Sequence, residues 1–266
     1  MVRDMSFRSN FWIECFASTS WVAMNLGFYL LIFRYAPEIG YGTGWGQYQF
    51  FVFLATTMFI NGIVQMFFMP NAIEFSELIR TGGLDFALLK PIDTQFLISL
   101  QKINWTPISN MAVAAVLLTY SLIQLAGDSS IQFSVSPLVA VLYPLFMLCG
   151  VAILYSLMIV LAAVSVWLGR NQALNNFWFS LTNFSRYPME IYNVRWGIPL
   201  MYFFTLIVPI LVVVNVPARL LAQPISPRQP WEWWLTGFGL LAAVLSVAIS
   251  RWVFVRALKS YRSASS

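Results

Sequence analysis

Long uncharged apolar runs alternate with short polar segments along the whole chain. A helix needs about 20 such residues to cross a hydrocarbon core of about 30 Å. One run, Phe16 to Tyr35, carries Arg34 at its end. The other runs of sufficient length are 50–69, 108–125, 138–168, 197–215 and 233–250. The pattern predicts an all-α integral membrane protein with about six transmembrane helices, built as a single domain over residues 1–266.

The composition agrees with that pattern and narrows the chemistry. Hydrophobic residues make up 59% of the chain and charged residues 9%, with 23 Phe and 11 Trp. So little polar surface could not keep the chain in solution. The two cysteines, Cys15 and Cys149, lie far apart and are too few for a metal cluster or a disulfide framework. We therefore expect no metal site and a lipid bilayer as surroundings.

The positive residues predict the orientation, since loops facing the cytoplasm collect Lys and Arg. The loops over residues 37–49 and 127–136 contain neither, so we expect them to face outward. With alternating spans, both termini then face the cytoplasm. The net charge of +5 follows from this bias and does not indicate nucleic-acid binding. The residues that fall on the inner side are Arg3, Arg8, Arg80, Lys90, Lys102, Arg251, Arg256, Lys259 and Arg262.

Residues 170–229 allow two topologies, and both keep six spans with the two termini inside. In the first, residues 169–196 form a cytoplasmic connection and 197–215 form the fifth span. In the second, Gln172 to Pro188 is a short fifth span, and residues 189–222 form a re-entrant hairpin at the outer face. The hairpin would be broken by Pro199, Pro209 and Pro217, which is tolerated where neighbouring protein satisfies the freed backbone groups.

The longest hydrophilic segment, residues 71–106, lies on the cytoplasmic side between spans two and three. Its acidic and basic side chains alternate with apolar ones at helical spacing, and Gly82 and Gly83 end that pattern. A second amphipathic piece begins at Leu84 and stops at Pro91. This predicts amphipathic helix lying along the inner membrane surface. The alternative is a plain interfacial connector.

Residues 1–15 predict a further interfacial helix, before the chain turns into span one. Phe7, Phe11 and Trp12 recur at roughly helical spacing, with Arg3 before them and Arg8 among them. The alternative is a membrane anchor without any other role.

The sequence Gly82-Gly83-Leu84-Asp85, followed by Leu88-Leu89-Lys90-Pro91, resembles a signature of type-2 ATP-binding-cassette (ABC) exporter permeases. Weaker similarity continues in the stretches 183–188, 191–192 and 217–221. In that family the signature segment docks into a groove of the ATPase subunit, and the resemblance also favours the re-entrant hairpin. It implies that the residues coupling this chain to an ATPase are Glu77, Arg80, Gly82, Leu84, Asp85, Lys90 and Pro91.

Span two carries a polar stripe of Thr57, Asn61 and Gln65 at positions i, i+4 and i+8. Unpaired amides in hydrocarbon cost several kcal/mol, so the stripe should face protein or a wet cavity. It could line the substrate path or the contact with a second permease. The alternative is ordinary hydrogen bonding between helices.

The chain has no ATP-binding machinery of its own. A phosphate-binding loop needs the pattern G-x-x-x-x-G-K-[ST], and none of the three lysines, Lys90, Lys102 and Lys259, stands in such a context. We therefore expect no cofactor in this chain, with ATP and Mg on a partner ATPase subunit.

Two other classes of function compete with a permease. A proton-coupled secondary transporter normally buries Asp, Glu or His in its spans, but this chain has no histidine and its acids lie outside the predicted spans. A membrane enzyme needs a nucleophile, a metal set or paired carboxylates, and none assembles here, so we expect no catalytic residues. A non-catalytic scaffold remains compatible with the composition.

The sequence and the resemblance together predict the permease subunit of an ATP-driven exporter. We expect alternating access for a hydrophobic or amphipathic substrate, such as a lipid or a drug-like molecule. The expected partners are cytoplasmic ABC ATPase subunits and a second permease, identical or homologous. The resemblance places the chain in a bacterial cytoplasmic membrane.

Overall fold

The computed structural model describes residues 8–40, 42–127, 136–168, 172–223 and 231–261. In these ranges the chain is helical and forms no strand. Five helices are long and apolar enough to cross a membrane, and one bent pair of shorter helices adds a sixth candidate. The helices are α2 (Arg8–Tyr35), α3 (Gln47–Phe67), α4 (Met69–Thr81), α5 (Leu84–Leu88), α6 (Thr94–Ser99), α7 (Ile108–Gly127), α8 (Pro137–Leu168), α9 (Gln172–Thr182), α10 (Ile198–Tyr202), α11 (Ile210–Ala222) and α12 (Trp231–Ser260). The all-helical membrane fold is therefore confirmed.

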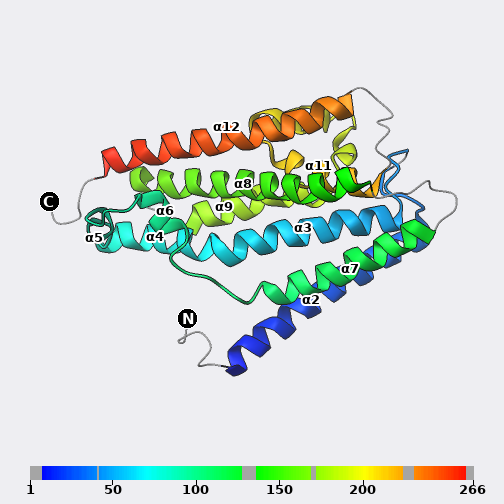
Figure 1. Ribbon diagram of the computed structural model, residues 1–266, viewed down its shortest axis with the longest axis horizontal. Coiled ribbons are helices and arrows are strands. Elements are labelled where there is room, and N and C mark those ends of the chain that lie inside the picture. Colours follow the sequence, from blue (N-terminus) through cyan, green and yellow to red (C-terminus); the bar gives the residue numbers. More distant parts are fainter. Residues whose placement is uncertain (1–7, 41, 128–135, 169–171, 224–230, 262–266) are drawn as a thin grey trace.

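Helix α8 lies at the centre of the bundle, between α12 on one side and α3 on the other (Figure 1). It contains no charged residue, as a helix surrounded by other apolar helices requires. Helices α7 and α2 follow beyond α3 and are tilted away from the rest (Figure 1). In the most apolar 18-residue stretch of α2, only 6% of the residues are buried, so most of that helix faces outward.

The bundle has two ends, which we name by what lies there. At the terminal end, Glu14 of α2 accepts a hydrogen bond from Thr106, and Phe254 of α12 packs on Phe75 of α4. The described parts of the chain next to both termini, and residues 71–106, thus share this end (Figure 1). At the hairpin end, Trp45 precedes α3 and donates a hydrogen bond to Glu190.

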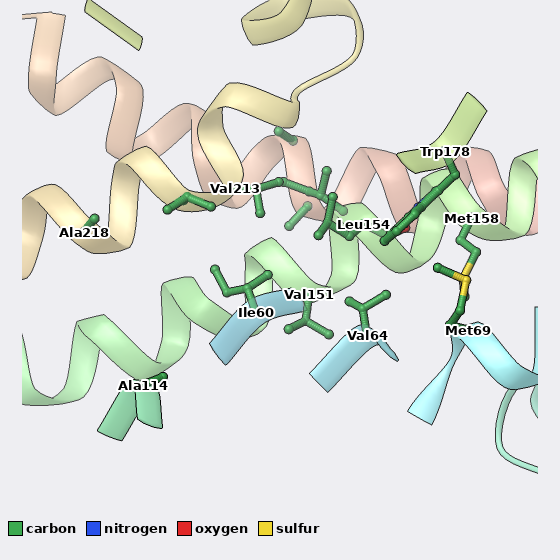
Figure 2. Close-up of a cluster of buried hydrophobic side chains, with 14 of the residues drawn as sticks. Ile60, Val64, Met69, Ala114, Val151, Leu154, Met158, Trp178, Val213 and Ala218 are labelled. Atoms are coloured by element: carbon green, nitrogen blue, oxygen red, sulfur yellow. The ribbon is translucent and has the colours of Figure 1, made fainter. Parts of the chain in front are cut away.

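The core between α3, α8, α9 and α11 is filled by apolar side chains (Figure 2). Ile60 and Val64 of α3 face Val151 and Leu154 of α8, and Trp178 of α9 covers the same cluster. The indole N–H of Trp178 donates to the carbonyl oxygen of Leu154 over 3.4 Å. These side chains fill the space between the four helices with closely packed apolar groups.

Three helices differ from the sequence-based expectation. Helix α2 runs without a break from Arg8, so the boundary predicted at residue 15 is absent, because 8–20 contain neither Gly nor Pro. Residues 1–7 of that prediction lie outside the described residues. Helix α4 continues the direction of α3 and packs along α8 instead of lying across the end of the bundle, because Pro70 occupies the first turn, where helices accept it. Helix α12 extends beyond Ser250, because arginine and lysine favour helix.

Candidate coupling segment and re-entrant hairpin

Helix α4 ends in a left-handed turn that redirects the chain at the terminal end. Gly82 caps α4 with φ of 72°, a conformation in which a side chain would be strained. The chain then forms α5, whose Leu84 is completely buried in the main core. Gly82 and Leu84 therefore fix the position of α5 on the bundle.

The outer face of α5 and the chain after it carry a concentrated apolar surface. Phe86 is 74% exposed and Leu89 is 81% exposed, and both lie outside the candidate membrane spans. An apolar surface of this kind outside a membrane span marks an interaction site. We name the exposed set Phe86, Leu88, Leu89, Ile92 and Phe96 the apolar face of the coupling segment.

Helix α6 is attached to α12 through Asp93. The Asp93 side chain caps α6 by accepting a hydrogen bond from the Phe96 backbone N–H over 3.0 Å. Its carboxylate also forms an ion pair with Arg251 of α12. The Arg251 guanidinium, and then the Phe96 N–H, hold the pKa of Asp93 below its ordinary value.

A second attachment joins α6 to α8. The hydroxyl of Tyr155 on α8 accepts a hydrogen bond from Gln95 over 3.1 Å and lies 2.7 Å from the hydroxyl of Ser99. Arg251 also donates to the Gln95 side-chain oxygen over 3.2 Å. Gln95 and Ser99 are both buried. One network of hydrogen bonds therefore connects α6 with α8 and α12.

The chain that leaves α6 is fastened to α4. Asn71 is buried, and its side chain donates to the carbonyl oxygens of Ser99 and Lys102 over 3.0 and 2.8 Å. The same side chain accepts the Lys102 backbone N–H over 2.7 Å. An ion pair of 2.7 Å between Glu74 and Lys102 lies beside it. Residues 71–106 thus form a folded unit and not a loose loop.

The residues predicted to couple the chain to an ATPase are only partly brought together. The side chain of Leu84 is completely buried in the core. Asp85 faces Tyr261, whose pKa is raised by burial of the hydroxyl and then by the negative charge of Asp85. The Arg80 side chain lies outside the described part of the structure. Exposed positions on the outer surface of the segment are Glu77, Lys90 and Pro91.

The polar stripe of span two forms hydrogen bonds mainly within its own helix. Thr57 is buried and donates to the carbonyl oxygen of Phe53 over 2.9 Å. Asn61 donates to the carbonyl oxygen of Thr57 over 3.0 Å, and Asn61 and Gln65 are partly buried. These local bonds reduce the cost of burying the two groups that make them.

The segment between α9 and α12 turns back on itself. Helix α10, the π-helical turn Phe203–Ile207 and helix α11 meet at a bend of 88°, where Pro209 caps α11. Asn215 of α11 accepts the backbone N–H of Met189 over 2.9 Å. Arg219 of α11 forms an ion pair with Glu190.

These contacts favour the second topology, because the two ends of the segment lie at the same end of the bundle. The ends of a straight helix that crosses the membrane would lie about 30 Å apart. Residues 197–215 are therefore not one straight span, and the segment turns back as a hairpin, a shape that fits a broken span or a re-entrant loop. Helix α9 and the 3-10 turn Asn183–Arg186 carry the chain from the end of α8 toward the hairpin end.

Helix α11 is seated closely on α8. Pro217 lacks the N–H that would pair with the Val213 carbonyl one turn earlier. That oxygen faces Gly150 of α8, where an added Cβ would lie only 2.7 Å away. Figure 2 shows Val213 pointing into the cluster that α3 and α8 share. Glycine at position 150 allows the approach that lets α11 pack into the core.

Sequence reasoning missed three groups of residues that the structure makes prominent. The sequence contains a hint of the ion pair between Glu190 and Arg219, since both are isolated charges beside an apolar run that prolines interrupt. The exposed apolar face had a weaker signal in Phe86 and Phe96 within a polar segment. The sequence contains no signal that singles out Tyr155, because a tyrosine within a long apolar span looks like any other aromatic residue there.

The described residues contain no group of His, Cys, Asp and Glu that could hold a metal ion.

No curated protein and no solved structure matches the chain. The sequence model of the ABC-2 family transporter proteins matches residues 19–265, which confirms the resemblance seen in the sequence. Permeases of this family span the membrane several times and lack catalytic and nucleotide-binding domains, and they generally pair with separate ATPase subunits that bind ATP. Because the match covers nearly the whole chain, this protein belongs to the ABC-2 family of transporter membrane proteins.

Proposed function

We propose that this permease is driven through the coupling segment at its terminal end, and that it exports a hydrophobic or amphipathic substrate such as a lipid or a drug-like molecule. The observation that carries the proposal is the exposed apolar face on α5 and α6. Helix α6 is attached to α8 by hydrogen bonds and to α12 by an ion pair, and α5 packs against α4 and α6. A surface that is both apolar and rigidly held is suited to transmit movement from another subunit.

The proposal places the terminal end in the cytoplasm of a bacterial cell, where ABC ATPase subunits bind it. Phe86 and Leu89 would enter a groove of the ATPase, with Glu77, Asp85 and Lys90 beside them. Closure of the ATPases would then push α6, and α6 would move α8 and α12 through Tyr155 and Arg251. The resulting motion is alternating access of the membrane helices.

A second permease, identical or homologous, completes the proposed complex. The centre of the described bundle is filled by side chains, so a substrate path would run between two permeases rather than within one (Figure 2). The polar stripe of Thr57, Asn61 and Gln65 is a candidate for lining that path. Aromatic and weakly polar spans suit a hydrophobic or amphipathic substrate.

The test of coupling compares exposed aromatic residues at opposite ends of the bundle. Phe86→Ser should remove most of the ATPase subunit that copurifies with the tagged permease, because Phe86 is 74% exposed at the centre of the apolar face. Tyr35→Ser is the matched control, since Tyr35 is 82% exposed at the end of α2 opposite the terminal end. Asp85→Lys should lower ATP hydrolysis by the purified complex while membrane insertion stays intact.

Mass spectrometry of the purified complex measures the retained ATPase and identifies the second permease. Equal retention in Phe86→Ser and Tyr35→Ser would refute the coupling assignment. Transport by the purified chain alone, in liposomes with an ion gradient and no nucleotide, would establish the secondary transporter instead.

A further inference from the structure

The last turns of α12 carry a groove of about 460 Å³, and Arg251 is the one residue of its lining that the proposed coupling mechanism uses. It lies at the terminal end, next to the attachment of Arg251 to Asp93. Three of its lining residues are cations, and one is an exposed tryptophan. The lining consists of Ala248, Arg251, Trp252, Val255, Arg256 and Lys259.

Two of the cations in the groove have no acidic partner among the residues that the structure describes. Arg251 is engaged by Asp93. No carboxylate of the described residues forms an ion pair with Arg256 or Lys259. The Arg256 guanidinium lies 5.3 Å from the centre of the Trp252 ring, which orients it without neutralising it. The groove is therefore a site of concentrated positive charge.

An apolar strip leads into the groove along the same face of α12. Leu241, Val244 and Leu245 are 53%, 67% and 48% exposed. Helical spacing places them in line with Trp252. Leu241 and Trp252 are 11 positions apart, which corresponds to about 16 Å along a helix. That length matches one leaflet of a hydrocarbon core of about 30 Å.

We propose that this face of α12 binds one anionic phospholipid of the leaflet at the terminal end. The phosphate lies between Arg256 and Lys259, Trp252 lies at the level of the glycerol, and an acyl chain follows the strip from Ala248 to Leu241. A soluble phosphate would use the cations but not the strip, and a neutral lipid would use the strip but not the cations. Only an anionic lipid uses both.

The test is a lipid titration of the full-length protein in neutral detergent, followed by native mass spectrometry. Phosphatidylglycerol should bind more tightly than phosphatidylcholine with the same acyl chains. Replacing both cations, in Arg256→Gln/Lys259→Gln, should weaken phosphatidylglycerol binding about 25-fold, or about fivefold for each charge removed. The charge-conserving pair Arg256→Lys/Lys259→Arg should retain most of the binding and shows that the face tolerates substitution.

Arg195→Gln is the matched control, because Arg195 and the neighbouring Trp196 form an exposed Arg–Trp pair away from this groove. That variant should bind phosphatidylglycerol as the unchanged protein does. Equal binding of the two lipids, or an equal loss in Arg195→Gln, would refute a specific site. Displacement of the lipid by inorganic phosphate would identify a free-anion site instead, and displacement by an added ATPase subunit would assign the groove to that interface. Each of these results is independent of whether Phe86 couples the permease to an ATPase.

Discussion

Glu190 and Arg219 place opposite charges in the hairpin, where their side chains are only 16% and 13% exposed. The indole N–H of Trp45 donates to Glu190 over 3.0 Å, and the Arg219 guanidinium lies 6.0 Å from the centre of the Trp45 ring. Two charges taken out of water at this depth are tolerated because each compensates the other. The three residues together tie both ends of the hairpin to the start of α3.

Removing one partner of this pair should destabilise the protein more than removing both. Arg219→Met leaves the Glu190 carboxylate enclosed without a counter-charge, and we expect a loss of about 3–5 kcal/mol in stability. The double variant Glu190→Gln/Arg219→Met should recover a large part of that loss. Thermal unfolding in lipid nanodiscs measures the difference, and additive effects of the two substitutions would contradict the pairing.

The contact between Glu190 and Arg219 could not be predicted from the sequence. Both charges are visible as isolated residues, but they are 29 positions apart and nothing in the chain states that they meet. Gly150 is similar, because its close approach to Val213 exists only after α8 and α11 have packed. Gly82 differs, since a glycine after an amphipathic stretch predicts a helix end directly, and α4 ends there.

At the scale of elements, α6 is a short helix attached to longer ones. It has six residues, too few to be stable alone, so its contacts with α8 and α12 determine its position. Tyr155 and Arg251 supply those contacts from two different helices. A displacement of α6 is therefore passed to both helices at once.

Tyr155→Phe should uncouple α6 from α8 at little cost to the fold. The change removes the hydroxyl shared by Gln95 and Ser99, and we expect a loss of about 1–3 kcal/mol. ATP hydrolysis by the complex should become insensitive to substrate, while copurification of the ATPase is retained. Tyr143→Phe is the control, since Tyr143 lies on the same helix and its hydroxyl is 3.0 Å from that of Thr56 near the opposite end. Equal effects of the two changes on coupling would exclude a specific role for Tyr155.

The long elements were predictable because charge and length alone define a membrane span. Expected and observed bounds agree within a few residues for α7 and α8. The bounds of the hairpin were not predictable from hydropathy, because its apolar run is as long as a span and only the prolines within it suggest a break. Pro70 in the first turn of α4 permits it to continue the direction of α3, but the packing of α4 along α8 is not encoded in any local pattern.

At the scale of the whole molecule, the two ends of the bundle have different chemistry. The terminal end carries the coupling segment and the basic groove of α12, while the hairpin end carries the enclosed pair of Glu190 and Arg219. Helix α7 packs against α3, and α2 lies beyond α7, away from the denser group around α8 (Figure 1). The hairpin at one end and the coupling segment at the other are connected by α8, by α12 and by α3 with its continuation α4, and α8, α12 and α3 each pack against α11.

The orientation of this arrangement in the membrane can be tested with single cysteines. In a variant whose Cys15 and Cys149 are replaced by serine, Arg195→Cys should react with an impermeant thiol reagent added to intact cells. This reaction is expected because Arg195 is exposed and lies at the hairpin end. It follows Glu190, which accepts a hydrogen bond from Trp45 there. Lys90→Cys, at the terminal end, should react only after permeabilisation. The reverse pattern would place the coupling segment outside the cell, where no ATPase could reach it.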